Sequence, residues 1–427
     1  MGLHRYFLYV CGQIGMMALT RYFFQWVIPF ASEGGGTAAN GTGIALFSAA
    51  GVGLLFFAFR IFDGITDPVA GILSDTWVRR GKQRRSLLWL SCLVPSIGLS
   101  LVFAPTLAMA PLLRWVLLGA GMFVFFVGYT FYAIPYWSLV DDYAGPVDER
   151  RRTLSNLLGA GVLVATAIGF IASPLLIESY GFFTGALAFA IPAAGLMMLP
   201  YFAQPPDAKP APEPSAEGQS SLESLKMALR HRKFLSVMLL FSGAQMSFTV
   251  MTASAVYIAT DLLSGSKGDV IMLLGPFLAS TLVSFVAVPA IARRYGWERT
   301  AVISCLLLAV VYAGTSGLGM PIAGSPMTAA MILFAFGGPM AAVMLGLEAE
   351  AVTSCAREQE GDATSIYFGV FNFIVKGLNG VALFVTGVLV DLRLEYATGA
   401  VRAMGLTAGA LLVLGVAAYY VTRPKRS

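Results

Sequence analysis

The feature that most constrains this chain is the recurrence of long apolar stretches along all of its 427 residues. A helix of roughly 20 apolar residues spans a hydrocarbon core of about 30 Å, and its backbone hydrogen bonds are satisfied internally. The composition agrees, because 57% of the residues are hydrophobic and only 12% are charged. We predict twelve membrane-spanning helices, at residues 6–31, 44–72, 86–105, 111–141, 154–177, 182–203, 234–262, 270–292, 300–319, 326–353, 363–391 and 398–422.

The basic residues of the loops predict the orientation in the membrane. The loop "TWVRRGKQRRS" (76–86) carries five basic residues, whereas the loop before it, "ASEGGGTAANGTG" (31–43), carries none. Basic loops face the cytoplasm, so the first loop is predicted to be cytoplasmic and the second external. The other basic segments fall on the side of the first loop, and they lie at 148–152, 229–234, 292–299, 356–361 and 423–427.

We therefore expect a multi-pass protein of a plasma membrane, the bacterial inner membrane, with both termini in the cytoplasm. The net charge of +5 is explained by these basic clusters, which face the anionic lipid leaflet, and no nucleic-acid partner is expected.

The long polar connection at residues 204–233 divides the predicted spans into six and six. We predict an N-terminal six-helix bundle at 1–203, a cytoplasmic linker at 204–233 and a C-terminal six-helix bundle at 234–427. The proline-rich first half of the linker favours an extended chain. From Ser220, with Glu223 completing a capping box, the pattern predicts a short amphipathic helix on the membrane surface. The fold class is an all-α integral membrane protein with two halves, as in transporters.

Two carboxylates stand inside the predicted span 44–72. Asp63 and Asp67 are four residues apart and so share one helix face. A charged residue near the centre of a membrane helix costs on the order of 2.5 to 3.5 kcal/mol, and carboxylate oxygens can share one cation or one proton. Lys376, in the span 363–391, is a candidate counter-charge. The three residues form either a static salt-bridge network or the ion site of a cation-coupled carrier, and the two-half architecture favours the carrier.

Other polar and aromatic residues in the spans leave two interpretations open. Arg21 either meets an anionic group of a substrate or extends to the membrane surface or a backbone carbonyl. The span 111–141 carries an aromatic cluster that either packs against other helices or, near Pro135, lines a cavity. The members of this cluster considered for substrate binding are Tyr129, Tyr132, Tyr136 and Trp137.

Two further carboxylates, Glu348 and Glu350, lie near the predicted cytoplasmic end of the span 326–353. They either form a gating salt bridge with an arginine such as Arg150 or are simply solvated.

The sequence does not favour an enzyme. Its four cysteines are scattered along the chain and its two histidines lie near predicted cytoplasmic ends, so they suggest neither a disulfide framework nor a metal cluster. No nucleophile is paired with a base in the spans. We expect no cofactor, apart from a coupling ion that is Na⁺ or H⁺ and whose ligands would include Asp63 and Asp67.

Three segments resemble a known transporter family. The segments are "RIFDGITDPVAGILSDTWVRRGKQRR" (60–85), "GYTFYAIPYWSLVDDY" (128–143) and "YFGVFNFIVKGLNG" (367–380). They are similar to the glycoside-pentoside-hexuronide:cation symporters, the melibiose permease-like branch of the major facilitator superfamily, which is related to the sodium-lysolipid symporters. The resemblance implies a cation site at Asp63, Asp67 and Thr130, with Lys376 beside it.

The same resemblance implies a loop motif in which Asp75 and arginines of the basic loop, among them Arg79 and Arg80, latch helices together in the outward-facing state. The sugar side of the family matches less well. Trp137 stands where the family has a tryptophan that stacks on the sugar, but its two sugar-binding aspartates are replaced by Ile14 and Ala133. The resemblance therefore does not imply galactoside binding.

We predict a cation-coupled secondary active transporter of a small organic solute, working by alternating access as a monomer in the lipid bilayer. The candidate substrate-binding residues suit a solute with one acidic or polar end and a larger apolar body, and they are Gln13, Arg21, Tyr129, Tyr132, Tyr136 and Trp137. The alternatives are a carrier of an amphipathic or lipid-like molecule and a non-transporting receptor or assembly factor on the same fold.

Overall fold

The computed structural model describes residues 2–36, 43–145, 147–205, 226, 230–320, 325–357 and 364–423. Helices account for nearly all of these residues, which confirms the predicted all-α class. The chain forms two compact units. The first is made of Met1–Phe47 and Ala58–Ala216, and the second of Ser48–Phe57 and Glu217–Ser427.

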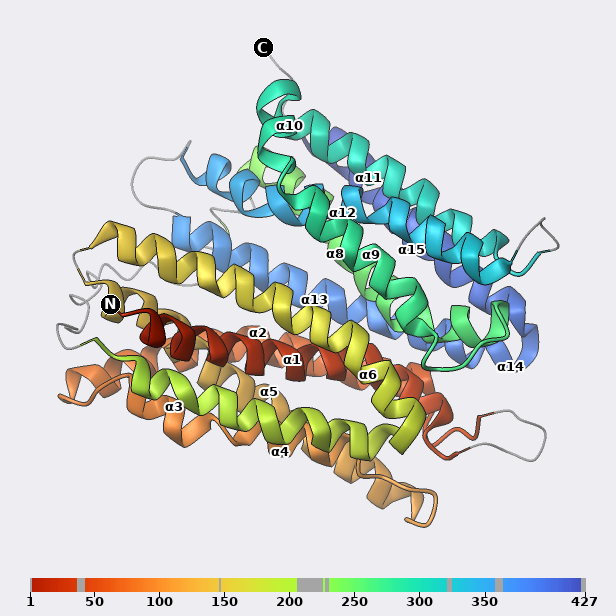
Figure 1. The fold of residues 1–427 in the computed structure, drawn as a ribbon, viewed down its shortest axis with the longest axis horizontal. Coiled ribbons are helices and arrows are strands. Elements are labelled where there is room, and N and C mark those ends of the chain that lie inside the picture. The colour runs from red at the N-terminus through yellow and green to blue at the C-terminus, as the bar shows by residue number, and fades with distance from the viewer. Residues whose placement is uncertain are drawn as a thin grey trace. The chain divides into compact units, whose positions relative to one another are not determined.

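The first unit is a bundle of long helices. Helices α1 and α6 run side by side, and α4 packs against α5 (Figure 1). Its elements are α1 (Leu3–Glu33), most of α2 (Ala49–Arg79), α3 (Arg85–Ser91), α4 (Val94–Val102), α5 (Pro111–Ala144), α6 (Asp148–Met198) and the short 3₁₀ helix η1 (Leu199–Ala203).

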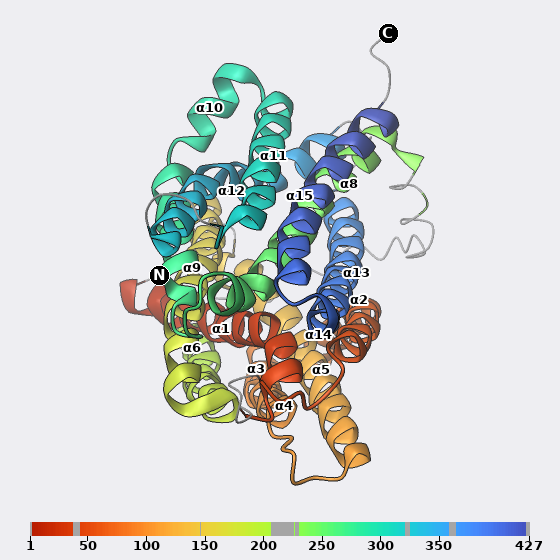
Figure 2. The ribbon, with the colours of Figure 1, turned by 90° about the vertical axis from the view of Figure 1, so that its right-hand side faces the viewer.

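The second unit is also a helical bundle, and it includes the first turns of α2. Helices α8, α13 and α15 pack together, and α9 packs along α12 (Figure 2). Besides the start of α2, its elements are α8 (Arg232–Tyr257), η2 (Ile258–Leu262), α9 (Val270–Phe285), α10 (Val288–Tyr295), α11 (Trp297–Gly314), η3 (Thr315–Gly317), α12 (Pro326–Ala356), α13 (Thr364–Asp391), α14 (Arg393–Tyr396) and α15 (Thr398–Thr422).

The helix lengths are compatible with the twelve predicted spans. Within the described part of the chain, nine helices are long and apolar enough to cross a membrane, or ten if the α9–α10 pair, bent by 60°, is one span. The 51-residue helix α6 covers two predicted spans, which are separated at Gly181. Gly181 has φ +80°, a conformation that glycine adopts without steric cost, so the helical path is interrupted there. Helix α1, with 31 residues, covers the first predicted span.

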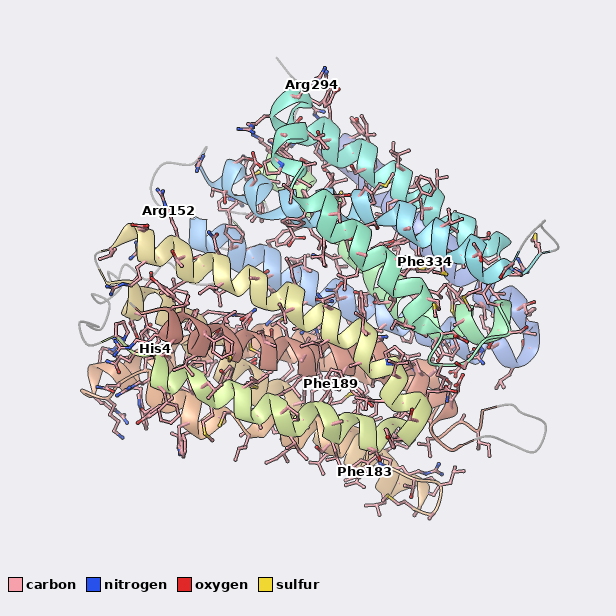
Figure 3. All side chains as sticks on the ribbon, viewed as in Figure 1. His4, Arg152, Phe183, Phe189, Arg294 and Phe334 are labelled. Atoms are coloured by element: carbon pink, nitrogen blue, oxygen red, sulfur yellow. The ribbon has the colours of Figure 1, made fainter. Side chains whose placement is uncertain are left out.

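Aromatic side chains form the core of the first unit and join α1 to α6. Trp26 donates a hydrogen bond of 2.7 Å from Nε1 to Ser173 Oγ, and the Tyr22 hydroxyl donates one of 2.6 Å to the carbonyl oxygen of Phe182. Buried tyrosines and tryptophans usually need such a partner for their polar atom. Basic His4 and Arg152 lie at one end of this unit, and Phe183 lies at the other (Figure 3).

The start of α2 is held against α13 within the second unit. A Cβ atom added at Gly53 or Gly387 would meet the backbone of the opposite helix at 2.6 and 2.3 Å, so the two helices approach closely there. The carboxylate of Asp391 caps α2, because it accepts hydrogen bonds of 2.8 and 3.0 Å from the backbone N–H groups of Ala49 and Ala50. This cap was not predicted from the sequence. The predicted interfacial helix beginning at Ser220 lies largely outside the described residues.

Candidate functional site

The two predicted carboxylates of α2 meet a hydroxyl group of α5. Asp63 is completely buried, and its Oδ1 accepts a hydrogen bond of 2.6 Å from Thr130 Oγ1. The same hydroxyl lies 3.4 Å from Oδ1 of Asp67, one helical turn further along α2. The structure thus brings together three residues that the sequence analysis assigned to one ion site. Their oxygens are the kind of ligand that hard cations prefer.

Arg60 is the partner of Asp63 that the sequence analysis missed. Its Nη1 lies 2.8 Å from Asp63 Oδ2, in an ion pair that is buried on both sides. The guanidinium group also lies over the rings of Phe24 and Phe126, at 5.2 and 5.7 Å from the ring centroids. Such cation–π contacts stabilise a desolvated arginine. The spacing of three residues between Arg60 and Asp63 is a helical-neighbour signal that was available in the sequence.

The charges of this cluster do not cancel. Arg60 neutralises one carboxylate, so Arg60, Asp63 and Asp67 together carry one net negative charge when both acids are ionised. The described residues bring no group of three or more His, Cys, Asp or Glu together that could hold a metal ion. Lys376 lies on α13 in the second unit and is half-buried, and its predicted part in the ion site stays a prediction.

The predicted substrate residues of α1 have partners on other helices of the first unit. Trp137 Nε1 donates a hydrogen bond of 3.1 Å to Gln13 Oε1, which ties α5 to α1. Arg21 Nε donates one of 3.0 Å to Thr166 Oγ1 on α6. Arg21 is half-buried, and the partner of its Nε is a side-chain hydroxyl and not a backbone carbonyl. These two contacts place polar groups of α1 toward α5 and α6.

The tyrosines of α5 divide into two groups. Tyr129 is half-buried and interacts electrostatically with Arg21 of α1 and with Asp63 of α2, which connects the predicted substrate residues to the ion site. Tyr132 and Tyr136 are fully buried, and their hydroxyls donate hydrogen bonds of 2.7 Å to the carbonyl oxygens of Met197 and Tyr9. Those two hydroxyls therefore stabilise the bundle itself.

Gln25 is a polar residue of α1 that the sequence analysis did not single out. It is 4% exposed, and neither its Oε1 nor its Nε2 has a hydrogen-bond partner among the described residues. It lies one turn after Arg21, on the same face of the helix. A buried amide without partners is unusual, because each unmade hydrogen bond costs about 1 to 3 kcal/mol. Its position inside a hydrophobic span was the only sequence signal.

The predicted loop motif is built around a different arginine. Arg84 donates from Nη2 to Asp75 Oδ1 at 2.8 Å and from Nη1 to Asp142 Oδ1 at 3.1 Å, so it joins the end of α2 to the end of α5. Arg79 and Arg80 are exposed, and their part in a latch stays a prediction. Arg84 also lines a cavity of about 270 Å³ at this end of the first unit.

Glu348 and Glu350 have different surroundings. Glu348 is half-buried, and its Oε2 accepts a hydrogen bond of 2.7 Å from Gln245 Nε2 on α8. Glu350 is exposed. Arg150, in the first unit, donates to the carbonyl oxygen of Tyr143 at 3.1 Å. The predicted gating salt bridge stays a prediction.

The helical fold and the polar residues inside its spans define a membrane transporter of the major facilitator superfamily. The chain belongs to the family described as MFS/sugar transport protein, whose model matches residues 8–421. Its relatives by fold are membrane transporters and not enzymes. No curated protein sequence matches the chain significantly.

Several solved transporters share the fold. The nucleoside transporter NupG, as a D323A mutant, aligns with a TM-score of 0.70 and 14% identity over 97% of this chain and 99% of its own. A bacterial homologue of the human lysosomal transporter Spinster, inward-facing and unoccupied, aligns with a TM-score of 0.68 and 14% identity over 98% and 95%. The POT family transporter PepTSo aligns with a TM-score of 0.68 and 10% identity over 99% and 98%. At these identities the likeness shows the fold alone.

Proposed function

We propose that a monovalent cation, Na⁺ or H⁺, drives this transporter and that it binds at Asp63, Asp67 and Thr130. The observation that carries the proposal is the convergence of three side-chain oxygens from α2 and α5, two of them from carboxylates of a helix long and apolar enough to cross a membrane. A carboxylate inside a membrane span is costly and is usually retained for function. The cation would be coupled to a small organic solute by alternating access, and no other cofactor is required.

Calorimetric titration of the purified protein with NaCl tests the ion site. We expect Asp67→Asn to abolish Na⁺ binding, because the substitution removes one of the two carboxylates whose oxygens converge on Thr130 Oγ1. Asp141→Asn is the matched control, since Asp141 is an exposed aspartate of α5 whose ion pair is with Arg151. If wild type binds no Na⁺, the same variants are compared for proton uptake with a pH indicator. Unchanged binding of both ions in Asp67→Asn would overturn the assignment.

For the solute we propose a molecule with one polar or acidic end and a larger apolar body. The support is the pairing of polar groups with aromatic or apolar ones on the first unit, where Gln13 meets Trp137 and Arg21 lies near Tyr129. Apolar Ile14 and Ala133 stand in place of the family's two sugar-binding aspartates, which also keeps an amphipathic or lipid-like substrate as the second candidate. A receptor without transport activity is less favoured, since it would have no use for an ion site.

A thermal-shift screen tests the substrate class. The probes are melibiose, uridine, a medium-chain fatty acid and lysophosphatidylcholine, each with Na⁺ and with choline as the replacement cation. Ligand binding to the folded state raises the unfolding temperature. We expect the two amphipathic probes to stabilise the protein more in Na⁺ than in choline. Stabilisation by melibiose alone would contradict the proposal.

We further propose a monomer in the bacterial inner membrane, with both termini in the cytoplasm. The basic residues His4 and Arg152 lie at the same end of the first unit, as the positive-inside rule requires of cytoplasmic ends (Figure 3). Cysteines introduced at Arg152 and at Glu178 test the orientation. We expect an impermeant thiol reagent added to intact cells to label the cysteine at 178 and not the one at 152, and the reverse pattern would contradict it.

A further inference from the structure

The second unit contains an acidic residue that the proposed ion site does not use. Glu348 lies within α12, a helix long and apolar enough to cross a membrane. Its Oε2 accepts the hydrogen bond from Gln245 Nε2, and Gln245 is neutral. No ion pair to Glu348 occurs within the described residues. Glu348 thus differs from Asp63, which has the guanidinium group of Arg60 as its partner.

The residues around Glu348 form a neutral polar strip across three helices. Gln245 and Thr249 are one turn apart on α8, and Thr249 Oγ1 lies 3.1 Å from Oδ1 of Asn379 on α13. All four side chains of the strip, those of Glu348, Gln245, Thr249 and Asn379, are half-buried, so none is shielded completely. Each of the three neighbours can donate or accept a hydrogen bond, but none carries a charge that could offset an ionised carboxylate.

The charged residues of the helices packed on α12 stand mostly at helix ends. Helix α12 packs against α8, α9, α10, α11 and α13, and α9 has no charged residue. Lys376 lies on α13 one turn before Asn379. The other charged or titratable residues on these helices are Arg232, Lys233, Tyr257, Arg293, Arg294, Tyr295, Glu298, Arg299, Cys305, Tyr312, Tyr367 and Asp391.

We propose that Glu348 is a proton-binding site of the second unit, separate from the cation site of the first. A proton from water binds to the carboxylate and gives a neutral carboxylic acid, and the reverse step returns it. The free Oε1 takes the proton while Oε2 keeps the hydrogen bond from Gln245. Neutralisation removes the cost of a charge inside a membrane span that has no counter-ion. The proposal does not depend on the identity of the ion at Asp63 and Asp67.

Infrared difference spectroscopy of the purified full-length protein, recorded as the pH is changed, tests this proposal with the proton as the probe. A protonated carboxylic acid has a carbonyl-stretch band that disappears on ionisation. We expect such a band to titrate in wild type, to be lost in Glu348→Gln and to persist in Glu350→Gln. Glu350 is the matched control, because it is two residues away on the same helix but exposed. Glutamine keeps the size of the side chain and can still accept from Gln245.

A second variant keeps the proposal testable if Glu348→Gln fails to fold. We expect Gln245→Leu to shift the same band to higher wavenumber, because the carbonyl oxygen loses its hydrogen-bond donor. A titrating band that is the same in wild type, Glu348→Gln and Gln245→Leu would overturn the proposal, as would a band that does not change with pH. Asp67→Asn should leave the band in place, so loss of the cation site and loss of the Glu348 site are distinguishable.

Discussion

At the scale of single residues, the ion pair between Arg60 and Asp63 assigns different roles to the two aspartates of α2. Asp63 is buried and pairs with the arginine, whereas Asp67 is half-buried. The two residues look equivalent in the sequence, because each is an aspartate in the same apolar helix. The structure gives them different surroundings, which the sequence does not show.

We predict that Asp63→Asn destabilises the protein more than Asp67→Asn does. Asparagine at position 63 leaves the guanidinium group of Arg60 buried without an anion, a change that typically costs about 3 to 5 kcal/mol. Thermal unfolding in detergent measures the difference. The double variant Arg60→Gln with Asp63→Asn removes both charges and should recover part of the loss. Equal unfolding temperatures for the two single variants would contradict the role given to Arg60.

A second prediction concerns the buried amide of Gln25. We expect Gln25→Leu to raise the free energy of unfolding by about 1 to 3 kcal/mol, because it removes a donor and an acceptor that have no partner. Gln13→Leu is the matched control on the same helix, and it should lower stability, since it breaks the hydrogen bond from Trp137. Chemical denaturation of both variants tests the pair. A loss of stability in Gln25→Leu would show that its amide has a partner such as a bound water.

For the proposed ion site, the sequence predicted which residues lie together better than it predicted their contacts. Asp63, Asp67 and Thr130 were assigned together, and they do lie together. Arg60 was not predicted as a partner of Asp63, although it stands three residues before it. The predicted counter-charge was Lys376, which is far away in the chain. Gln25 could not be found from sequence, since an unsatisfied amide differs from a satisfied one only by its neighbours. Tyr132 and Tyr136 illustrate the same limit, because their hydroxyl partners are backbone atoms of other helices.

At the scale of helices, polar contacts at the helix ends decide how neighbouring helices are held. The apolar runs predict where helices lie, and helix α6 with its interruption at Gly181 agrees with two adjacent predicted spans. The apolar runs do not predict the contacts at the helix ends. Asp391 caps the start of α2, and Arg84 joins the end of α2 to the end of α5. The cap by Asp391 and the contact between Arg84 and Asp142 join residues distant in sequence, for which a single sequence has no signal.

We predict that the cap supplied by Asp391 stabilises the second unit. Asp391→Ala removes the acceptor for two backbone N–H groups of α2, and a lost N-terminal cap costs about 0.5 to 2 kcal/mol. Asp391→Asn keeps an acceptor but loses the charge that interacts favourably with the helix dipole, so we expect a smaller loss. Thermal unfolding of the two variants should give the order wild type, Asn, Ala. An alanine variant as stable as wild type would contradict it.

The contact made by Arg84 gives a prediction for the end of the first unit. Arg84→Lys keeps the charge but cannot bond two carboxylates through separate nitrogens of a planar fork, so we expect a loss of about 1.5 to 3 kcal/mol. Arg79→Lys is the control, because Arg79 is exposed in the same loop. Unfolding by denaturant measures both variants. Equal losses of stability in the two variants would mean that the positive charge of the loop stabilises the protein and that the planar guanidinium group of Arg84 adds nothing.

At the scale of the whole molecule, the sequence determines the class of protein but not its substrate. Hydropathy and the positions of polar residues were enough to predict an all-α transporter, and the family match over residues 8–421 confirms it. The nucleoside transporter NupG, as a D323A mutant, and the POT family transporter PepTSo share this fold at 14% and 10% identity, so the fold leaves the cargo open. The solute must be read from the few side chains that face it.

The last prediction is that the protein does not bind melibiose appreciably, although its family is described by sugar transport. A sugar site needs buried carboxylates that accept several hydroxyl hydrogen bonds, and each hydroxyl left without an acceptor costs about 1 to 3 kcal/mol. Ile14 and Ala133 can accept none with their side chains, and the Tyr132 and Tyr136 hydroxyls already donate to backbone carbonyls. The indole nitrogen of Trp137 is bonded to Gln13, which leaves its ring as a stacking face only. Calorimetric titration with melibiose in saturating Na⁺ should show no heat of binding, and a millimolar or tighter dissociation constant would show that other side chains supply the missing acceptors.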